Sequence, residues 1–327
     1  MRALRLVLLV VLVAGCASEA KRDAALDASV TRELARLDRD LKVAEANGLP
    51  SFLVPLAKRH RAALDEVRAS ASPELKLYRL RDPFIGIETL RFVASHGAAS
   101  QNLAAFESVW NDERRTFDAI EPVHGTALRR ALYQSAANRG RVLALASLPY
   151  GRTSAPGEGL FYLAEAEGNR LFAHFVASLD DTSVGDEPAA TRGAIATAAD
   201  ALERETLAAY DRQPTGKTTI PVSVRLKESR ELLARGWADG AALLLLEARL
   251  ELSRRNGGTT HATASAPRHD GSFASLLGEL SRDQKSGQIV SADVVPLFDS
   301  LFDAGSGADA IPFKAPVVVT LVRWPYT

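Results

Sequence analysis

The sequence has 327 residues, of which 46% are hydrophobic, enough for one large or two ordinary domains with a sizeable core, and this excludes wholesale disorder. Its 40 basic and 40 acidic residues balance, which argues against a general nucleic-acid-binding protein, because such proteins usually carry a basic excess. A single cysteine excludes an intramolecular disulfide and any zinc or iron–sulfur site built from several cysteines.

The N-terminal residues are typical of a secretory signal. Arg2 and Arg5 precede an apolar run at residues 6–14, and small residues follow it. As a helix this run rises only about 14 Å, which is too short to cross a hydrocarbon core of about 30 Å. A positive start, a short apolar run and a small-residue exit together predict a cleaved signal rather than a membrane span.

The signal ends with Val13-Ala14-Gly15-Cys16, which resembles the lipobox of bacterial lipoproteins: an aliphatic residue, two small residues and a cysteine. The only cysteine of the sequence stands at the required position. The resemblance implies that Cys16 receives a diacylglyceryl group on its sulfur, that residues 1–15 are removed, and that the new amino terminus is acylated. The alternative is an ordinary signal peptide that happens to contain a cysteine.

Lipidation would make the membrane a partner of this protein. Two or three acyl chains anchor a protein stably, at about 0.8 kcal/mol per buried methylene. In Gram-negative lipoproteins an Asp after the cysteine commonly retains the protein at the inner membrane, whereas Ala17 and Ser18 stand there in this sequence. We therefore expect an outer-membrane anchor facing the periplasm, with a Gram-positive cell surface as the alternative.

Apolar residues at helical spacing predict a series of helices after the signal. The first has an apolar stripe and ends at Asn47-Gly48, and the second spans 51–69. The stripe consists of Leu26, Val30, Leu34, Leu37, Leu41 and Ala44. Ser72-Pro73 and Asp82-Pro83 each predict a helix start with Pro at the first helical position, and the second of these helices stops at His96-Gly97.

Further helices are predicted over 101–120, 127–148, 160–179, 186–210, 222–234 and 238–254. Pro149-Tyr150-Gly151 is predicted to end the helix at 127–148. Residues 256–270 are small and polar, which predicts a loop or linker. Two short helices follow at 272–284 and 291–302. The β-branched run 317–322 predicts a strand that either packs as an extended arm or pairs near residues 218–224.

The expected class is mostly α, with about ten helices in antiparallel hairpins that form an α-solenoid or an irregular helical array. Residues 16–255 form the predicted helical domain, and residues 271–327 are expected to pack on it. The segment 224–254 resembles the middle of a tetratricopeptide unit. The matching positions are Gly236, Ala241, Leu245, Ala248 and the small Ser229. Arg225 stands where that family has a bulky residue, and no 34-residue period is sustained, so a hairpin without repeat ancestry is an equal alternative.

Few residues suggest catalysis. Glu107-Ser108 resembles the Glu-Ser pair of lytic transglycosylases, in which the Glu is the general acid, but that family's downstream Gly-rich segment is missing. A solvated helix face is the alternative interpretation. No Gly-x-Ser-x-Gly elbow occurs, and no cysteine remains for nucleophilic chemistry. We therefore predict no catalytic residue and no cofactor.

Other motifs have simpler interpretations. Gly216-Lys217-Thr218 lacks the earlier glycine of a phosphate-binding loop, and the acidic segment 180–187 lacks the oxygen donors of an EF-hand. No two of the six histidines have the spacing of a metal-binding pair. His261 and His269 form a weak metal-site alternative in the predicted linker, and His174 is predicted to be partly buried.

Trp110, Trp237 and Trp324 are the aromatic candidates for partner contact, with burial in the core as the alternative. The lipobox, the helical hairpins and the lack of a catalytic constellation predict a lipid-anchored envelope protein that serves as a scaffold for a protein partner. The alternative is an envelope enzyme, or a protein that binds a glycan or another small ligand in a pocket between helices. Binding to nucleic acid is not expected.

The lipid anchor can be tested by intact-mass analysis of the membrane-bound protein. We expect the mass of residues 16–327 plus that of the acyl groups, because cleavage and acylation both occur at Cys16. The variant Cys16→Ala should be neither acylated nor held at the membrane. A free thiol at Cys16 without any acyl mass would contradict the anchor.

Overall fold

The computed structural model describes residues 2–49, 51–70, 73–117, 123, 125–179, 199, 203–204, 206–208, 210, 220–255, 289–290 and 317–318. The described part confirms the helical class. Its α-helices are α1 (Arg2–Ala46), α2 (Val54–Arg68), α3 (Pro73–Ser95), α4 (Leu103–Glu113), α5 (Ala127–Thr153), α6 (Pro156–Ser178), α8 (Ile220–Ala234) and α9 (Ala238–Arg255). Short 3-10 helices occur at Ser51–Leu53, Gly97–Ser100 and Arg114–Thr116.

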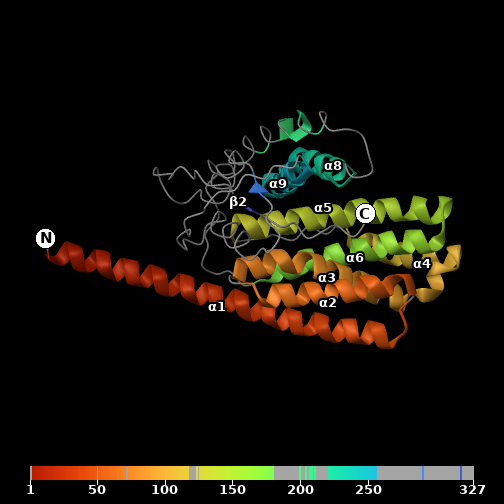
Figure 1. Ribbon diagram of the computed structural model, residues 1–327, viewed down its shortest axis with the longest axis horizontal. Helices are drawn as coiled ribbons and strands as arrows, with labels where there is room; N and C mark the ends of the chain where they lie inside the picture. The colour runs from red at the N-terminus through yellow and green to blue at the C-terminus, as the bar shows by residue number, and fades with distance from the viewer. Residues whose placement is uncertain are drawn as a thin grey trace.

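The helices lie side by side as an open stack (Figure 1). Contacts run from α1 and α2 to α3, then to α6, α5, α9 and finally α8. The order in space therefore differs from the order in sequence, because α6 lies between α3 and α5. In a simple solenoid each hairpin packs on the next one in the sequence. The irregular antiparallel array describes this part of the chain better.

The apolar stripe predicted for the first helix is the face that α1 buries. All six stripe residues, from Leu26 to Ala44, are at most 4% exposed. The helix ends near the predicted Asn47-Gly48, where Gly48 has a φ of +83° and its N–H donates to the carbonyl of Glu45. The helix itself is longer than predicted, because its backbone is continuous from Arg2, and its N-terminal part projects beyond the other helices (Figure 1).

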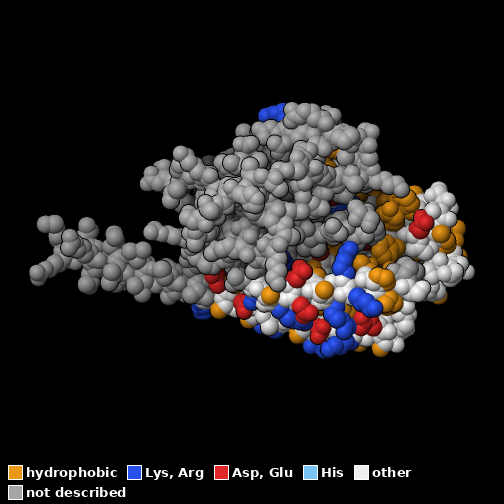
Figure 2. Space-filling model, in the orientation of Figure 1, with side chains coloured by type: hydrophobic (Ala, Val, Ile, Leu, Met, Phe, Trp, Pro, Cys, Tyr) orange, Lys and Arg blue, Asp and Glu red, His pale blue; other side chains and the backbone are white. Residues whose placement is uncertain are grey.

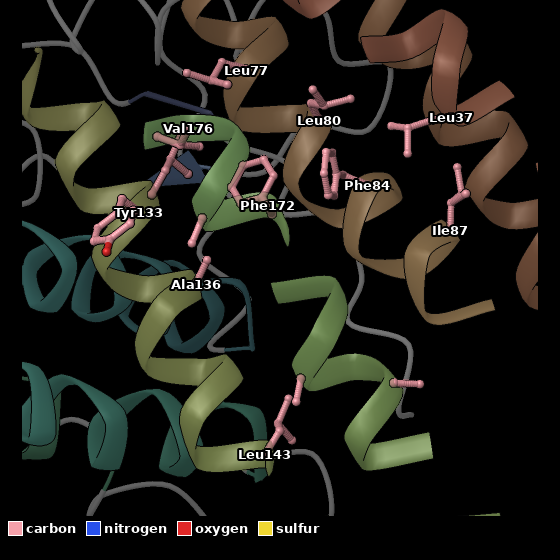
Figure 3. Close-up of a cluster of buried hydrophobic side chains, with 14 of the residues drawn as sticks. Leu37, Leu77, Leu80, Phe84, Ile87, Tyr133, Ala136, Leu143, Phe172 and Val176 are labelled. Atoms are coloured by element: carbon pink, nitrogen blue, oxygen red, sulfur yellow. The ribbon is translucent and has the colours of Figure 1, made fainter. Parts of the chain in front are cut away.

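Aromatic rings from α3 and α6 meet in a core of mostly aliphatic side chains, where Figure 3 shows Phe84 and Phe172. Phe84 of α3 meets Phe172 of α6 edge-on, with ring centroids 5.4 Å apart, and also stacks on Phe175. The two helices approach closely at Gly168, where a Cβ atom would lie 2.6 Å from the carbonyl oxygen of Ile85. A glycine at this point therefore permits the α3–α6 packing on which the neighbouring helices depend.

Two predicted helix boundaries at prolines are wrong. Pro83 lies inside α3, which is one helix from Pro73 to Ser95. Pro83 has no N–H for the carbonyl four residues earlier, but it is buried beside Phe84, and packing on both sides of α3 outweighs that local cost. Pro149 likewise lies inside α5, whose last turn carries Gly151 against the Phe106 ring of α4 and against Gly159 of α6.

The helix α4 is also shorter than the predicted 101–120. The side chain of Asn102 accepts a hydrogen bond from the Ala105 N–H and caps the start of the helix, and a 3-10 turn follows Glu113. Residues 118–122 lie outside the described part, as do most of the predicted helix 186–210, the linker 256–270 and the helices 272–284 and 291–302. The predicted hairpin of 222–234 and 238–254 matches α8 and α9 to within two residues.

Two short strands pair near the C-terminal end. β1 (Ile289–Val290) and β2 (Val317–Val318) are antiparallel, with Ile289 opposite Val318. β2 falls in the predicted 317–322 run, but residues 220–224 belong to α8, so the suggested pairing with that segment is wrong.

Candidate functional site

A cavity of about 270 Å³ lies between α3, α5, α6, α8 and α9. This is just below the usual range for small-ligand pockets, about 300–1,000 Å³. Most of its wall is apolar or aromatic, from Ile85, Ala136, Phe161, Tyr162, Val224 and Leu244. Its charged lining consists of Arg81, Arg139, Arg225, Glu165, Glu228 and Glu247. The lining therefore carries equal numbers of guanidiniums and carboxylates.

The six charged residues form an alternating series, which we call the charge ladder. Its first half links α3, α9 and α8. Arg81 donates to Glu247 Oε1 at 2.7 Å, and Arg225 donates to Glu247 Oε2 at 3.3 Å. Tyr78 adds a hydroxyl bond of 3.2 Å to the same carboxylate, so Glu247 is held by three donors from two other helices.

The second half of the charge ladder links α8, α5 and α6. Arg139 of α5 donates to Glu228 of α8 at 2.5 Å and makes a longer contact of 3.5 Å with Glu165 of α6. Arg225 and Glu228 are three residues apart on α8 and share one face, which joins the two halves. The three glutamates are buried, and the three arginine side chains are only 11–16% exposed.

Burial and ion pairing affect the two central carboxylates differently. Burial alone would raise the pKa of Glu247, but Arg81 and Arg225 outweigh it and hold that pKa below its usual value. The stabilisation from Glu247 is therefore present above the ordinary carboxyl pKa and is lost as the pH falls through the lowered value. For Glu228 burial dominates and raises the pKa, with Arg139 offsetting only part of the effect.

Local sequence features set the positions of these side chains. On α6, Phe161, Glu165 and Asn169 recur every four residues and therefore project from one face into the cavity. The α8–α9 hairpin turns at Gly236, whose φ is +73°. At the start of α9, Asp239 accepts from Arg130 at 3.0 Å, and the Gly240 N–H donates to Gln134 at 2.7 Å. These contacts fix α9 on α5.

The residues singled out in the sequence do not converge on this cavity. Glu107 lies on α4, where Arg152 donates to its carboxylate at 2.7 Å on the surface. Trp110 is half-buried and donates to the carbonyl of Ala144, while Trp237 is half-buried against Tyr133. These two tryptophans contact α5 at points about 16 Å apart along the helix. Cys16 and Trp324 lie where the structure describes no side chains.

The histidine predictions have mixed outcomes. His174 is exposed on α6, so its predicted partial burial is wrong. His60, to which no role was assigned, is buried against Gly86, and burial lowers its pKa to about 3. His261 and His269 lie outside the described residues. Among the described side chains, no group of three His, Cys, Asp or Glu residues could hold a metal ion.

Sequence reasoning missed the charge ladder, although two signals were present. Arg225 interrupts the bulky position of the tetratricopeptide-like hairpin, and it proves to be an ion-pair partner of Glu247. Glu247 directly follows four leucines, Leu243 to Leu246, where a solvated carboxylate is not expected. A charged residue inside an apolar helical run is therefore the signal to examine.

Comparisons with family models, with curated proteins and with solved structures found no match for the chain. Within the part of the chain that the structure describes, no helix is both long enough and apolar enough to span a membrane.

The charge ladder predicts a large penalty for removing its central carboxylate. Glu247→Gln should lower the free energy of unfolding by about 3 kcal/mol, because Arg81 and Arg225 would remain buried without that negative charge. The matched control is Glu107→Gln, which breaks an exposed ion pair and should cost at most about 1 kcal/mol. Urea unfolding followed by helical circular dichroism measures both. Equal, small effects would contradict the ladder.

Proposed function

We propose that this protein is a lipid-anchored helical protein of a bacterial cell envelope and that its body binds a small ligand in the cavity between α3, α5, α6, α8 and α9. The observation that carries the proposal is the charged lining of an otherwise apolar cavity. This is the ligand-binding alternative considered for the sequence. It now accounts for more of the geometry than the protein scaffold does.

The energetics of buried charge support ligand binding. Ion pairs in a low-dielectric interior lose hydration, and apolar residues of similar volume often stabilise a protein as well or better. Six charged side chains placed around an open space are therefore a poor solution for stability alone. They also leave charged atoms at the cavity surface, where a ligand gains directional hydrogen bonds.

The position of the packed body supports the lipid anchor. Among described side chains, the first buried apolar one is Leu26, ten positions after Cys16. Removal of residues 1–15 would leave the buried stripe of α1 untouched. The intervening residues are a short tether between the acylated cysteine and the helical array, consistent with the projecting start of α1 in Figure 1.

The enzyme alternative receives no support from Glu107. A general acid needs to reach a bound substrate. Glu107 is outside the cavity lining and is paired with Arg152. We therefore place the proposed activity at the cavity and assign no reaction.

A protein-interaction scaffold is the second candidate, and exposed apolar side chains favour it. Leu103 of α4 and Leu145 and Tyr150 of α5 are between 41% and 59% exposed. Figure 2 shows apolar side chains gathered at the end of the molecule where α4, α5 and α6 lie, whereas charges of both signs are mixed over α1 to α3. A partner protein recruited at the membrane would dock on this end.

Native mass spectrometry tests whether a ligand occupies the cavity. Protein extracted from its membrane should be heavier under native than under denaturing conditions, because only the covalent acyl groups survive denaturation. Ala136→Leu places three extra carbon atoms in the cavity wall and should abolish this difference. Ala104→Leu, on the exposed face of α4, should retain it.

Two results together would contradict the proposed ligand site. The native and denatured masses would agree, and adding the small-molecule fraction of an envelope extract would leave the melting temperature of the protein unchanged. A stoichiometric protein partner in a detergent pull-down, together with that result, would favour the scaffold.

A further inference from the structure

Every charged side chain of the cavity lining has a partner of opposite charge. Glu247 accepts from Arg81 at 2.7 Å and from Arg225 at 3.3 Å, and Arg81 also contacts Asp82 at 3.3 Å. Each of these two guanidiniums therefore faces a carboxylate before any ligand is present.

The charges that α5 and α6 contribute are paired in the same way. Arg139 donates to Glu228 at 2.5 Å and contacts Glu165 at 3.5 Å. Arg225 and Glu228 lie one turn apart on the same face of α8, so groups of opposite sign alternate over a short distance. A ligand group that bonds to the charge ladder is therefore close to both signs.

This arrangement disfavours a charged ligand. A ligand carboxylate bonded to Arg225 would lie near Glu247, which already accepts from that guanidinium. A ligand ammonium bonded to Glu228 would lie near Arg139 for the same reason. The repulsion between like charges and the lost hydration of the ligand ion both cost free energy away from water. An uncharged ligand avoids both costs.

A neutral polar group can nevertheless use the charge ladder. A guanidinium only donates hydrogen bonds, a carboxylate only accepts them, and a hydroxyl does both. A ligand hydroxyl can therefore bond to Arg81 or to Glu228 without bringing a charge into the cavity. Such a bond restricts how an uncharged ligand is oriented.

The remaining wall selects an apolar body for the ligand. Ile85, Val224 and Leu244 contribute aliphatic surface from three helices, and Phe161 and Tyr162 contribute aromatic rings. An apolar cavity of about 150 Å³ holds benzene. The cavity between these helices is about 270 Å³, nearly twice that volume, so its size suits two fused rings.

We propose that the cavity binds an uncharged, mainly apolar molecule about the size of two fused rings, with a hydroxyl or a similar neutral polar group beside the charge ladder. The inference rests on the proposed ligand-binding function and specifies its ligand class. Tyr162 of the wall also stacks on the exposed Tyr150, with ring centroids 4.5 Å apart. Aromatic surface thus continues from the cavity to the solvent.

Calorimetric titration of the full chain in detergent with four small molecules tests the proposal. At pH 7, 2-naphthalenemethanol is neutral, 2-naphthoate is an anion and 2-naphthylmethylammonium is a cation on the same ring system. Glucose is neutral but polar over its whole surface. The naphthyl alcohol should bind at least about ten-fold more tightly than either ion, and glucose should not bind at millimolar concentration.

A blank and two matched variants assign the binding to the cavity. Titration into the detergent buffer alone measures partition into micelles. Ala136→Leu fills part of the cavity and should abolish binding of the naphthyl alcohol, whereas Ala104→Leu, on the exposed face of α4, should retain it. If Ala136→Leu does not fold, Val224→Phe fills the cavity from α8 instead.

The possible failures are distinguishable. An ion or glucose that binds as tightly as the naphthyl alcohol, or an alcohol that does not bind above the blank, would overturn the assignment of an uncharged apolar ligand. If a native mass difference that Ala136→Leu abolishes is nevertheless present, the ligand-binding function stands and only the ligand class is wrong. If that difference is also missing, the function itself fails.

Discussion

The docking of the α8–α9 hairpin on the other helices depends on the pairing of buried charges. Arg81 of α3 and Glu247 of α9 are 166 residues apart in sequence, yet their ion pair is 2.7 Å long and nearly closed to solvent. Arg139 makes the equivalent link from α5 to Glu228 of α8. Each charge is tolerable only while its partner is in place, since an uncompensated buried charge costs several kcal/mol. These pairs lie beside apolar side chains in the wall of the cavity, at the meeting point of five helices.

A second group of buried ion pairs lies between α1 and α3, away from the charge ladder. Glu88 of α3 is 1% exposed and pairs with Arg36 of α1 at 2.6 Å and with Arg91 at 2.7 Å. It joins α1 to α3, but it is not part of the lining of the cavity described above, and Arg36 also lies over the Phe84 ring. This ion-pair group helps to hold α1 against α3. The charge ladder differs because it surrounds open space, and this difference is the reason for assigning binding to one site and packing to the other.

Amphipathic elements were predictable from the sequence, whereas their pairing was not. The Leu26–Ala44 stripe and the α8–α9 hairpin follow from three- and four-residue spacing, which reports one buried face per helix. Pro83 and Pro149 misled the prediction, because a proline rule describes local backbone cost and takes no account of the helices packed around it. Glu165 and Glu247 were given no role in the sequence prediction for the same reason. Their partners come from other helices, and no short-range pattern encodes that proximity. The proposed lipid anchor rests on the opposite situation, a signal contained wholly in consecutive residues.

A double-mutant cycle on Arg139 and Glu228 tests most directly whether the charge ladder holds the hairpin on the array. The variants are Arg139→Met, Glu228→Leu and both together, each measured by urea unfolding. We predict that the double variant loses much less stability than the sum of the single variants, with a coupling of at least about 2 kcal/mol, because each single change leaves one buried charge without this partner. Additive losses within about 0.5 kcal/mol would contradict the account.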